Sequence, residues 1–143
     1  MTLLILPEFP NSLADPFVIT SNFDECYNCI AWAYGDSTKW YWPDEHGLAF
    51  WPNDIPHETT LTAFQALFER IGYEICDNGV YESGYEKIAI FTNEDKSPTH
   101  AAKQLNNDTW SSKLEIANDV SHTILSISSG AYGSVAIYMR RLK

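Results

Sequence analysis

The hydrophobic period of this chain changes at Gly72, and this change limits its possible folds more than any other feature. Before it, apolar residues recur at helical spacing, namely Leu61, Phe64, Leu67, Phe68 and Ile71. After it, short apolar stretches alternate with turn residues, which is typical of strands. A chain that begins with helices and continues with strands favours helices packed on an antiparallel sheet. The sequence therefore predicts an α+β fold.

The expected elements follow from local signals. Asn28 as N-cap and Gly35 as terminator predict a first helix at Cys29–Tyr34, and a second helix follows from the spacing above, with Gly72 at its end. Strands are expected at 73–76, 87–92, 100–105, 109–114 and 134–142, and a short helix at 120–129. Residues 1–22, with three prolines, and the loop 36–57 are expected to be irregular.

Size and charge narrow the class of protein. A chain of 143 residues fits a single domain, 1–143, and 45% hydrophobic residues can fill its core. The net charge of −10 argues against nucleic-acid and membrane partners and is compatible with a basic protein partner. The N-terminus lacks the basic region of a signal peptide, and three cysteines are an odd number, so a reducing, cytoplasmic location is expected.

Cys26 and Cys29 form a C-x-x-C pattern that three chemistries could use. A redox pair normally follows a strand, and a structural zinc site needs four ligands, so both fit less well than a single nucleophilic thiol. Unpaired N–H groups and the helix dipole at a helix start favour a thiolate, so Cys29 is the candidate nucleophile. The alternative is a buried structural cysteine. No metal and no cofactor are expected.

His100 is the candidate base for this thiol. It opens a predicted strand, and the small neighbours Ala101 and Ala102 leave room for a facing helix. The alternative is a histidine that simply makes a hydrogen bond within a strand. If the strands on either side of 106–108 form a hairpin, the residue that orients His100 lies between Ser112 and Glu115. Residues of the following segment, Asp119 or His122, are further options.

These segments carry a family resemblance. NCIAWA resembles the helix motif, and THAAKQLNNDTWSSKL the histidine strand and its neighbour, of papain-like thiol amidohydrolases, closest to the NlpC/P60 and CHAP types. The chain is also similar, over most of its length, to small bacterial proteins of the DUF7689 type. The first resemblance implies a papain-like fold, with N-terminal helices packed on an antiparallel sheet, and a Cys29–His100 pair completed by Ser112 or Glu115.

Two functions of different classes are therefore expected. The first is a cysteine-dependent hydrolase of a peptide or protein amide, in which the Cys29 N–H and Tyr27 or Asn28 hold the oxyanion. Its substrate cleft would be lined by tryptophans, namely Trp32, Trp40, Trp42, Trp51 and Trp110. These rings could equally pin a long loop to the domain. The alternative function is a non-catalytic, acidic protein of the immunity type that binds a basic partner.

Overall fold

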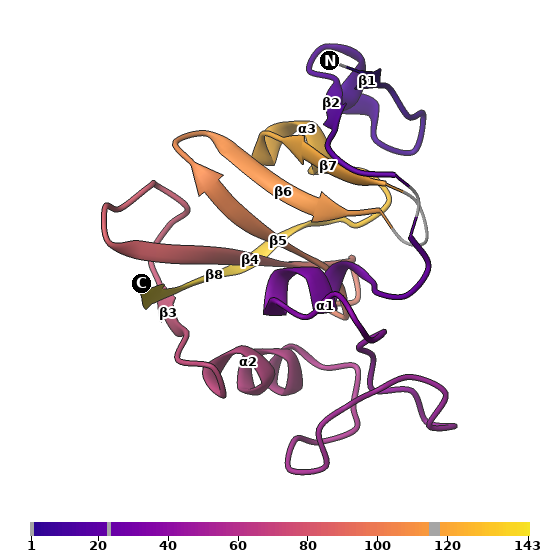
Figure 1. Ribbon diagram of the computed structural model, residues 1–143, viewed down its shortest axis with the longest axis vertical. Helices are drawn as coiled ribbons and strands as arrows, with labels where there is room; N and C mark the ends of the chain where they lie inside the picture. The colour runs from indigo at the N-terminus through magenta and orange to yellow at the C-terminus, as the bar shows by residue number, and fades with distance from the viewer. Residues whose placement is uncertain (1, 23, 115–117) are drawn as a thin grey trace.

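The computed structural model describes residues 2–22, 24–114 and 118–143. Within these ranges, eight strands form one antiparallel sheet in the order β1-β2-β7-β6-β5-β4-β8-β3 (Figure 1). The strands are β1 (Leu3–Leu4), β2 (Phe17–Ile19), β3 (Glu74–Cys76), β4 (Tyr85–Thr92), β5 (Pro98–Asn106), β6 (Thr109–Lys113), β7 (Asp119–His122) and β8 (Ser134–Leu142). The helices are α1 (Cys29–Tyr34), α2 (Leu61–Glu69), α3 (Ile124–Ile127) and the 3-10 turn η1 (Pro10–Leu13).

The sheet separates two hydrophobic cores. Because side chains alternate along a strand, Ile88, Ile90 and Ala101 pack with α1 and α2 on one face. Their neighbours Ala89 and Phe91 pack on the other face, with residues of the N-terminal segment and α3. Figure 1 shows α1 and α2 below the strands, with the loop that joins them extending away from the sheet. We call these the α1 face and the α3 face.

Local signals predicted several elements correctly. The expected bounds of α1 and β8 are confirmed. The Asn28 side chain accepts a hydrogen bond from the Ala31 N–H at 3.1 Å, and Gly35 ends α1 in the left-handed conformation with a φ of 100°. Thr60 caps α2, which ends at Glu69, slightly earlier than the spacing suggested.

The predicted fold class was wrong. The body of the protein is a broad antiparallel sheet with short helices, not a papain-like α+β arrangement of N-terminal helices on a sheet. β2 lies in the segment 1–22, which was expected to be irregular, and β7 overlaps the helix expected at 120–129. These two strands pair with each other through Val18 and Ser121. Such pairing between distant segments supplies hydrogen bonds that override local preference.

Candidate functional site

Cys29 and His100 lie on opposite faces of the sheet. Cys29 is 3% exposed and belongs to the core of the α1 face, together with Ala101 of β5. His100 precedes Ala101 in the same strand and therefore points to the other face. Its ring stacks on Tyr132 at 4.0 Å between centroids, and Tyr132 belongs to the core of the α3 face. The structure does not assemble a Cys29–His100 pair.

His100 belongs instead to a buried chain of hydrogen bonds that crosses three strands. Its Nε2 lies 2.8 Å from the Ser112 Oγ, and the same oxygen lies 2.7 Å from Nε2 of His122. The Nδ1 of His122 lies 2.8 Å from the carbonyl oxygen of Thr123. We call His100, Ser112 and His122 the His–Ser–His relay. Ser112 thus contacts His100, whereas Glu115 lies outside the described residues.

The positions of the protons in this relay follow from hydrogen-bonding capacity. A carbonyl oxygen only accepts, so Nδ1 of His122 carries its proton and Nε2 is the acceptor of the neutral ring. The single hydroxyl proton of Ser112 is then donated to His122, and Ser112 accepts from the Nε2–H of His100. The Nδ1 of His100 is left with a lone pair and has no hydrogen-bond partner among the described residues.

Burial keeps both rings neutral. It holds the pKa of His100 well below the usual 6.5, with the neighbouring His122 as a second cause. Burial also lowers the pKa of His122 to about 4, although the Thr123 carbonyl and Asp15 oppose the shift. A relay without charge and without access to Cys29 serves the stability of the α3 face.

The two residues before Cys29 hold the start of α1 in place. The Asn28 Oδ1 also accepts from the Tyr41 N–H at 3.0 Å, and its Nδ2 donates to the Tyr41 carbonyl at 2.6 Å. The Tyr27 hydroxyl donates to Asp119 Oδ2 at 2.9 Å, and burial raises the pKa of Tyr27 to about 12. Tyr27 and Asn28, the two residues predicted as second oxyanion donors, therefore both use their side chains in structural contacts.

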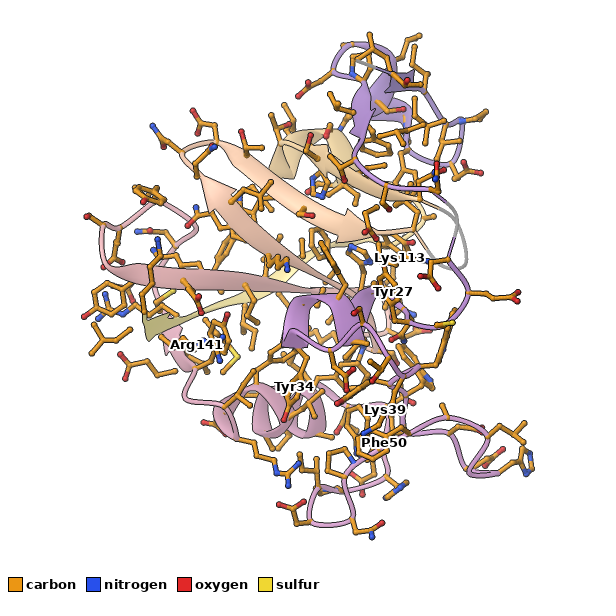
Figure 2. The ribbon with its side chains drawn as sticks, in the orientation of Figure 1. Tyr27, Tyr34, Lys39, Phe50, Lys113 and Arg141 are labelled. Atoms are coloured by element: carbon orange, nitrogen blue, oxygen red, sulfur yellow. The ribbon has the colours of Figure 1, made fainter. Side chains whose placement is uncertain are left out.

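Lys113 is buried beside Tyr27, near the start of α1. Lys113 is 0% exposed, and its Nζ lies 5.1 Å from the centroid of the Tyr27 ring. Figure 2 shows Lys113 and Tyr27 together at one end of α1. Lys113 is also the cross-strand neighbour of Asp119, so opposite charges face each other here.

Three of the five predicted tryptophans belong to the loop between α1 and α2. Trp42 and Trp51 pack on Phe64 of α2, with centroids at 5.3 and 5.2 Å. The Trp51 indole also donates to the carbonyl of Pro56 at 3.1 Å. Trp40 is half-buried, and its carbonyl oxygen accepts a hydrogen bond from the Phe50 N–H, in the same loop, at 2.8 Å. Trp42 and Trp51 pin the loop against α2.

The other two tryptophans lie on the sheet. Trp32 of α1 donates to the Ser111 Oγ at 3.0 Å, which ties the helix to β6. Trp110 is 2% exposed and packs on Tyr138 at 5.9 Å between centroids. Trp110 also borders an open groove on the α3 face.

The remaining cysteines show no activation. Cys26 is exposed, and a hydrogen bond with Asp24 is the main cause that raises its pKa. Cys76 is only partly buried on β3, and burial raises its pKa. Within the described ranges, no group of three or more His, Cys, Asp or Glu side chains could hold a metal ion. No helix in the same ranges is both long and apolar enough to cross a bilayer.

The groove beside Trp110 has a volume of about 660 Å³ and lies between α3, the β5–β6 turn and the loop at 78–80. Trp110 and Tyr138 form its floor. Val80 and Leu125, on its rim, are 63% and 69% exposed. We call this the acidic groove, because Asp15 and Asp108 line it and no Lys or Arg does so among the described residues.

The walls of the acidic groove are held by specific contacts. Gly79 lies so close to the floor that a Cβ there would stand 2.5 Å from the Tyr138 ring. The Gln104 amide donates to the Gly79 carbonyl at 2.7 Å, which fixes this loop to β5. On the opposite wall, Thr123 donates to Asp15 Oδ2 at 2.5 Å. The groove is therefore formed before any partner arrives.

Comparison with known families identifies the chain at the level of its family. The family model for a domain of unknown function, DUF7689, matches residues 18–140. The chain belongs to the DUF7689 family. Neither the curated proteins nor the solved structures contain a match to it. The DUF7689 match runs from β2 into β8, so it includes the His–Ser–His relay and the acidic groove except for Asp15.

Sequence reasoning missed two features of this DUF7689 chain. It named His122 only as one option for orienting His100, whereas the hydrogen bonds of His122 determine which atoms of the relay carry protons. It also missed the acidic groove, which is built from segments far apart in the chain. The alternation in TWSSK was an available signal, because it sends Trp110 and Ser112 to one face and Ser111 and Lys113 to the other.

Proposed function

We propose that this chain is a binding protein without catalytic turnover and that it docks a basic protein partner in the acidic groove. The observation that carries the proposal is the composition of that groove, in which two carboxylates flank exposed apolar side chains. Exposed apolar surface rimmed by polar groups is typical of protein interaction sites. The carboxylates of Asp15 and Asp108 select for cationic groups on the partner.

The charge of the whole chain supports the same partner class. A net charge of −10 attracts a basic protein at long range and accelerates its association, most strongly at low salt. The groove would then supply the short-range contacts. An odd number of cysteines favours a reducing compartment, so we include a cytoplasmic location in the proposal.

The geometry gives the hydrolase hypothesis no comparable support. A general base must lie within hydrogen-bond reach of the group from which it takes a proton. His100 faces away from Cys29, and its Nε2 proton is donated to Ser112. The side chains of Tyr27 and Asn28 are likewise bonded elsewhere.

The test uses an acetylated tripeptide amide with leucine between two arginines, followed by amide chemical shifts in NMR spectra. We expect saturable shifts at Gly79, Asp108 and Leu125, and weaker shifts with glutamines in place of the arginines. Asp108→Asn should weaken binding about two- to fivefold, as expected for one partly exposed charge. Asp95→Asn, at an exposed turn elsewhere, is the matched control.

Two results would contradict the proposal. One is the absence of shifts in the groove, or equal effects of the two aspartate variants. The other is selective alkylation of Cys29 by iodoacetamide below pH 7 that is lost in His100→Ala, because only a thiol enzyme needs such reactivity. The alkylation series from about pH 5 to 9 spans the ordinary thiol pKa.

A further inference from the structure

A second cavity, of opposite charge, opens on the other side of the sheet. It has a volume of about 300 Å³ and lies between the end of α1, the segment before β3, and strands β4, β5 and β8. Its lining contains Lys87, Lys103, Arg141 and Lys143, against the single carboxylate of Glu86. We call it the basic cleft. Tyr34 and Arg141, both labelled in Figure 2, belong to its walls.

The basic charge of this cleft stands out against the rest of the chain. The chain has 9 Lys and Arg residues and 19 Asp and Glu residues. The side chains of three of those basic residues, Lys103, Arg141 and Lys143, belong to this one cavity, with one acidic residue, Glu86, beside them. A local excess of cations with low-dielectric walls concentrates anions, even in a protein whose total charge is negative.

Arg141 and Lys87 are held in place by contacts inside the protein. The Arg141 Nε lies 2.6 Å from Glu86 Oε2, its Nη1 donates to the Ile71 carbonyl at 3.0 Å, and its guanidinium lies 4.7 Å from the Tyr73 ring. The Lys87 Nζ is paired with Glu82 at 2.9 Å and donates to the Asn78 carbonyl at 3.1 Å. Because Lys87 precedes Ile88, which packs on the α1 face, its ammonium group points to the α3 face and adds no cation to the cleft. Arg141 is a fixed charge paired with Glu86 rather than a mobile ligand.

Two cations of the cleft remain, Lys103 and Lys143. Lys143 is exposed, with its Nζ 5.8 Å from the centroid of the Tyr81 ring, whereas Lys103 is partly buried and is therefore the more fixed of the two. In the described part of the chain Lys103 makes no ion pair, and its Nζ lies 3.8 Å from the centroid of the Trp32 ring. It lines the cleft from β5, directly opposite Ser111 of β6. Burial lowers its pKa from the usual 10.5, so its ammonium group has given up part of its hydration. An anion in the cleft would replace that hydration.

The rest of the wall is aromatic. Tyr34, Tyr73, Tyr81 and Tyr85 line the cavity, and rings of this kind pack against flat ligand groups. Burial raises the pKa of Tyr73 to about 12, so its hydroxyl keeps its proton and can donate it. Phenol hydroxyls and an ammonium group in one cavity are donors that suit the oxygens of a phosphate or carboxylate.

We propose that the basic cleft binds a small anion that carries an aromatic ring, with Lys103 as the main contact to its phosphate or carboxylate and the tyrosines around its ring. The site is independent of the acidic groove, because different residues line the two cavities. The cavity volume fits a ligand of one or two rings, at the small end of typical ligand sites.

The test is a titration of the isotope-labelled protein with phenyl phosphate, benzoate and inorganic phosphate, followed by amide shifts. We expect phenyl phosphate to give saturable shifts at Gly35, Gln104 and Leu105. Inorganic phosphate should bind about tenfold more weakly, since it leaves the tyrosines uncovered. The comparison of phenyl phosphate with benzoate decides whether the preferred anionic group is a phosphate or a carboxylate. Benzylamine, a cationic ring compound, should not bind.

Two variants and a control make the result specific to Lys103. Lys103→Gln should weaken phenyl phosphate binding about tenfold, while Lys103→Arg should retain most of it. Lys96→Gln makes the same charge change at an exposed turn and should have little effect. Equal losses in Lys103→Gln and Lys96→Gln would overturn the proposal. So would binding of benzylamine as tight as that of phenyl phosphate, or shifts without saturation.

Discussion

The His–Ser–His relay predicts that this protein loses stability between pH 8 and pH 5. Both rings are neutral in the folded protein, because burial lowers their pKa values. In the unfolded chain they bind protons once the pH falls to about 6.5. Below that value the unfolded state therefore holds more protons than the folded state, and acidification favours unfolding.

The magnitude follows from the two pKa values of His122. A fall from 6.5 in the unfolded chain to about 4 in the fold lowers the free energy of unfolding by about 2 kcal/mol between pH 8 and pH 5. His100 acts in the same direction, so the slope of the free energy approaches about 3 kcal/mol per pH unit below pH 6. Asp36 and Glu82, whose pKa values are lowered, lose their contributions only at more acidic pH.

The assay is urea denaturation followed by tryptophan fluorescence, in half-unit steps from pH 8 to pH 5. His122→Gln removes one titrating ring and keeps an amide oxygen that can accept from Ser112. We expect this variant to be less stable at pH 8, and its slope to fall by half, to about 1.4 kcal/mol per pH unit. His46→Gln, a substitution of an exposed histidine, is the matched control.

The result that would refute this reasoning is a free energy of unfolding that stays constant from pH 8 to pH 5. An unchanged slope in His122→Gln would refute it equally, since it would assign the proton uptake to groups outside the relay. The m-value should be the same across the series, because a change in it would indicate a different unfolded state rather than a titration.

Three further substitutions test the packing that surrounds these sites. Asn28→Ala should cost about 2–4 kcal/mol in urea denaturation, because it removes the cap of α1 and leaves buried backbone groups unpaired. Gly133→Ala should cost about 3 kcal/mol or more in thermal unfolding, since its φ is 79° and its Cβ would lie 2.0 Å from the Thr92 carbonyl oxygen. Gly79→Ala should displace the Tyr138 ring, seen as a shift of its ring protons in NMR spectra, because the added Cβ would lie 2.5 Å away.

Elements defined by nearby residues could be predicted from the sequence. The start and end of α1 depend on Asn28 and Gly35, both adjacent to the helix. The strand at 134–142 needs only its own alternation and β-branched residues. The strand β7, in contrast, depends on pairing with β2, a hundred residues earlier, and nothing in its own four residues distinguishes it from a short helix.

The side of the sheet to which His100 points could not be predicted. Alternation reveals the direction of a side chain only when one face is polar. In β5 both Ala101 and Ala102 are fully buried, one in each core. The residues next to His100 therefore do not indicate which face of the sheet its side chain occupies. A shift by one residue would have placed the imidazole against α1. The resemblance to thiol hydrolases depended on that undetermined orientation.

The same alternation explains how one acidic chain can carry two binding sites of opposite charge. In β5, Lys103 lines the basic cleft, while the next residue, Gln104, holds the loop of the acidic groove. In β8, Tyr138 lies on the floor of the groove, and Arg141 belongs to the cleft. The two cavities open to solvent on opposite faces, where salt screens charges over a Debye length of about 8 Å at physiological ionic strength. Salt therefore weakens the interaction between the charges bound in them. A basic partner in the groove and an aromatic anion in the cleft should bind with little mutual effect in physiological salt, and each should favour the other as the salt is lowered.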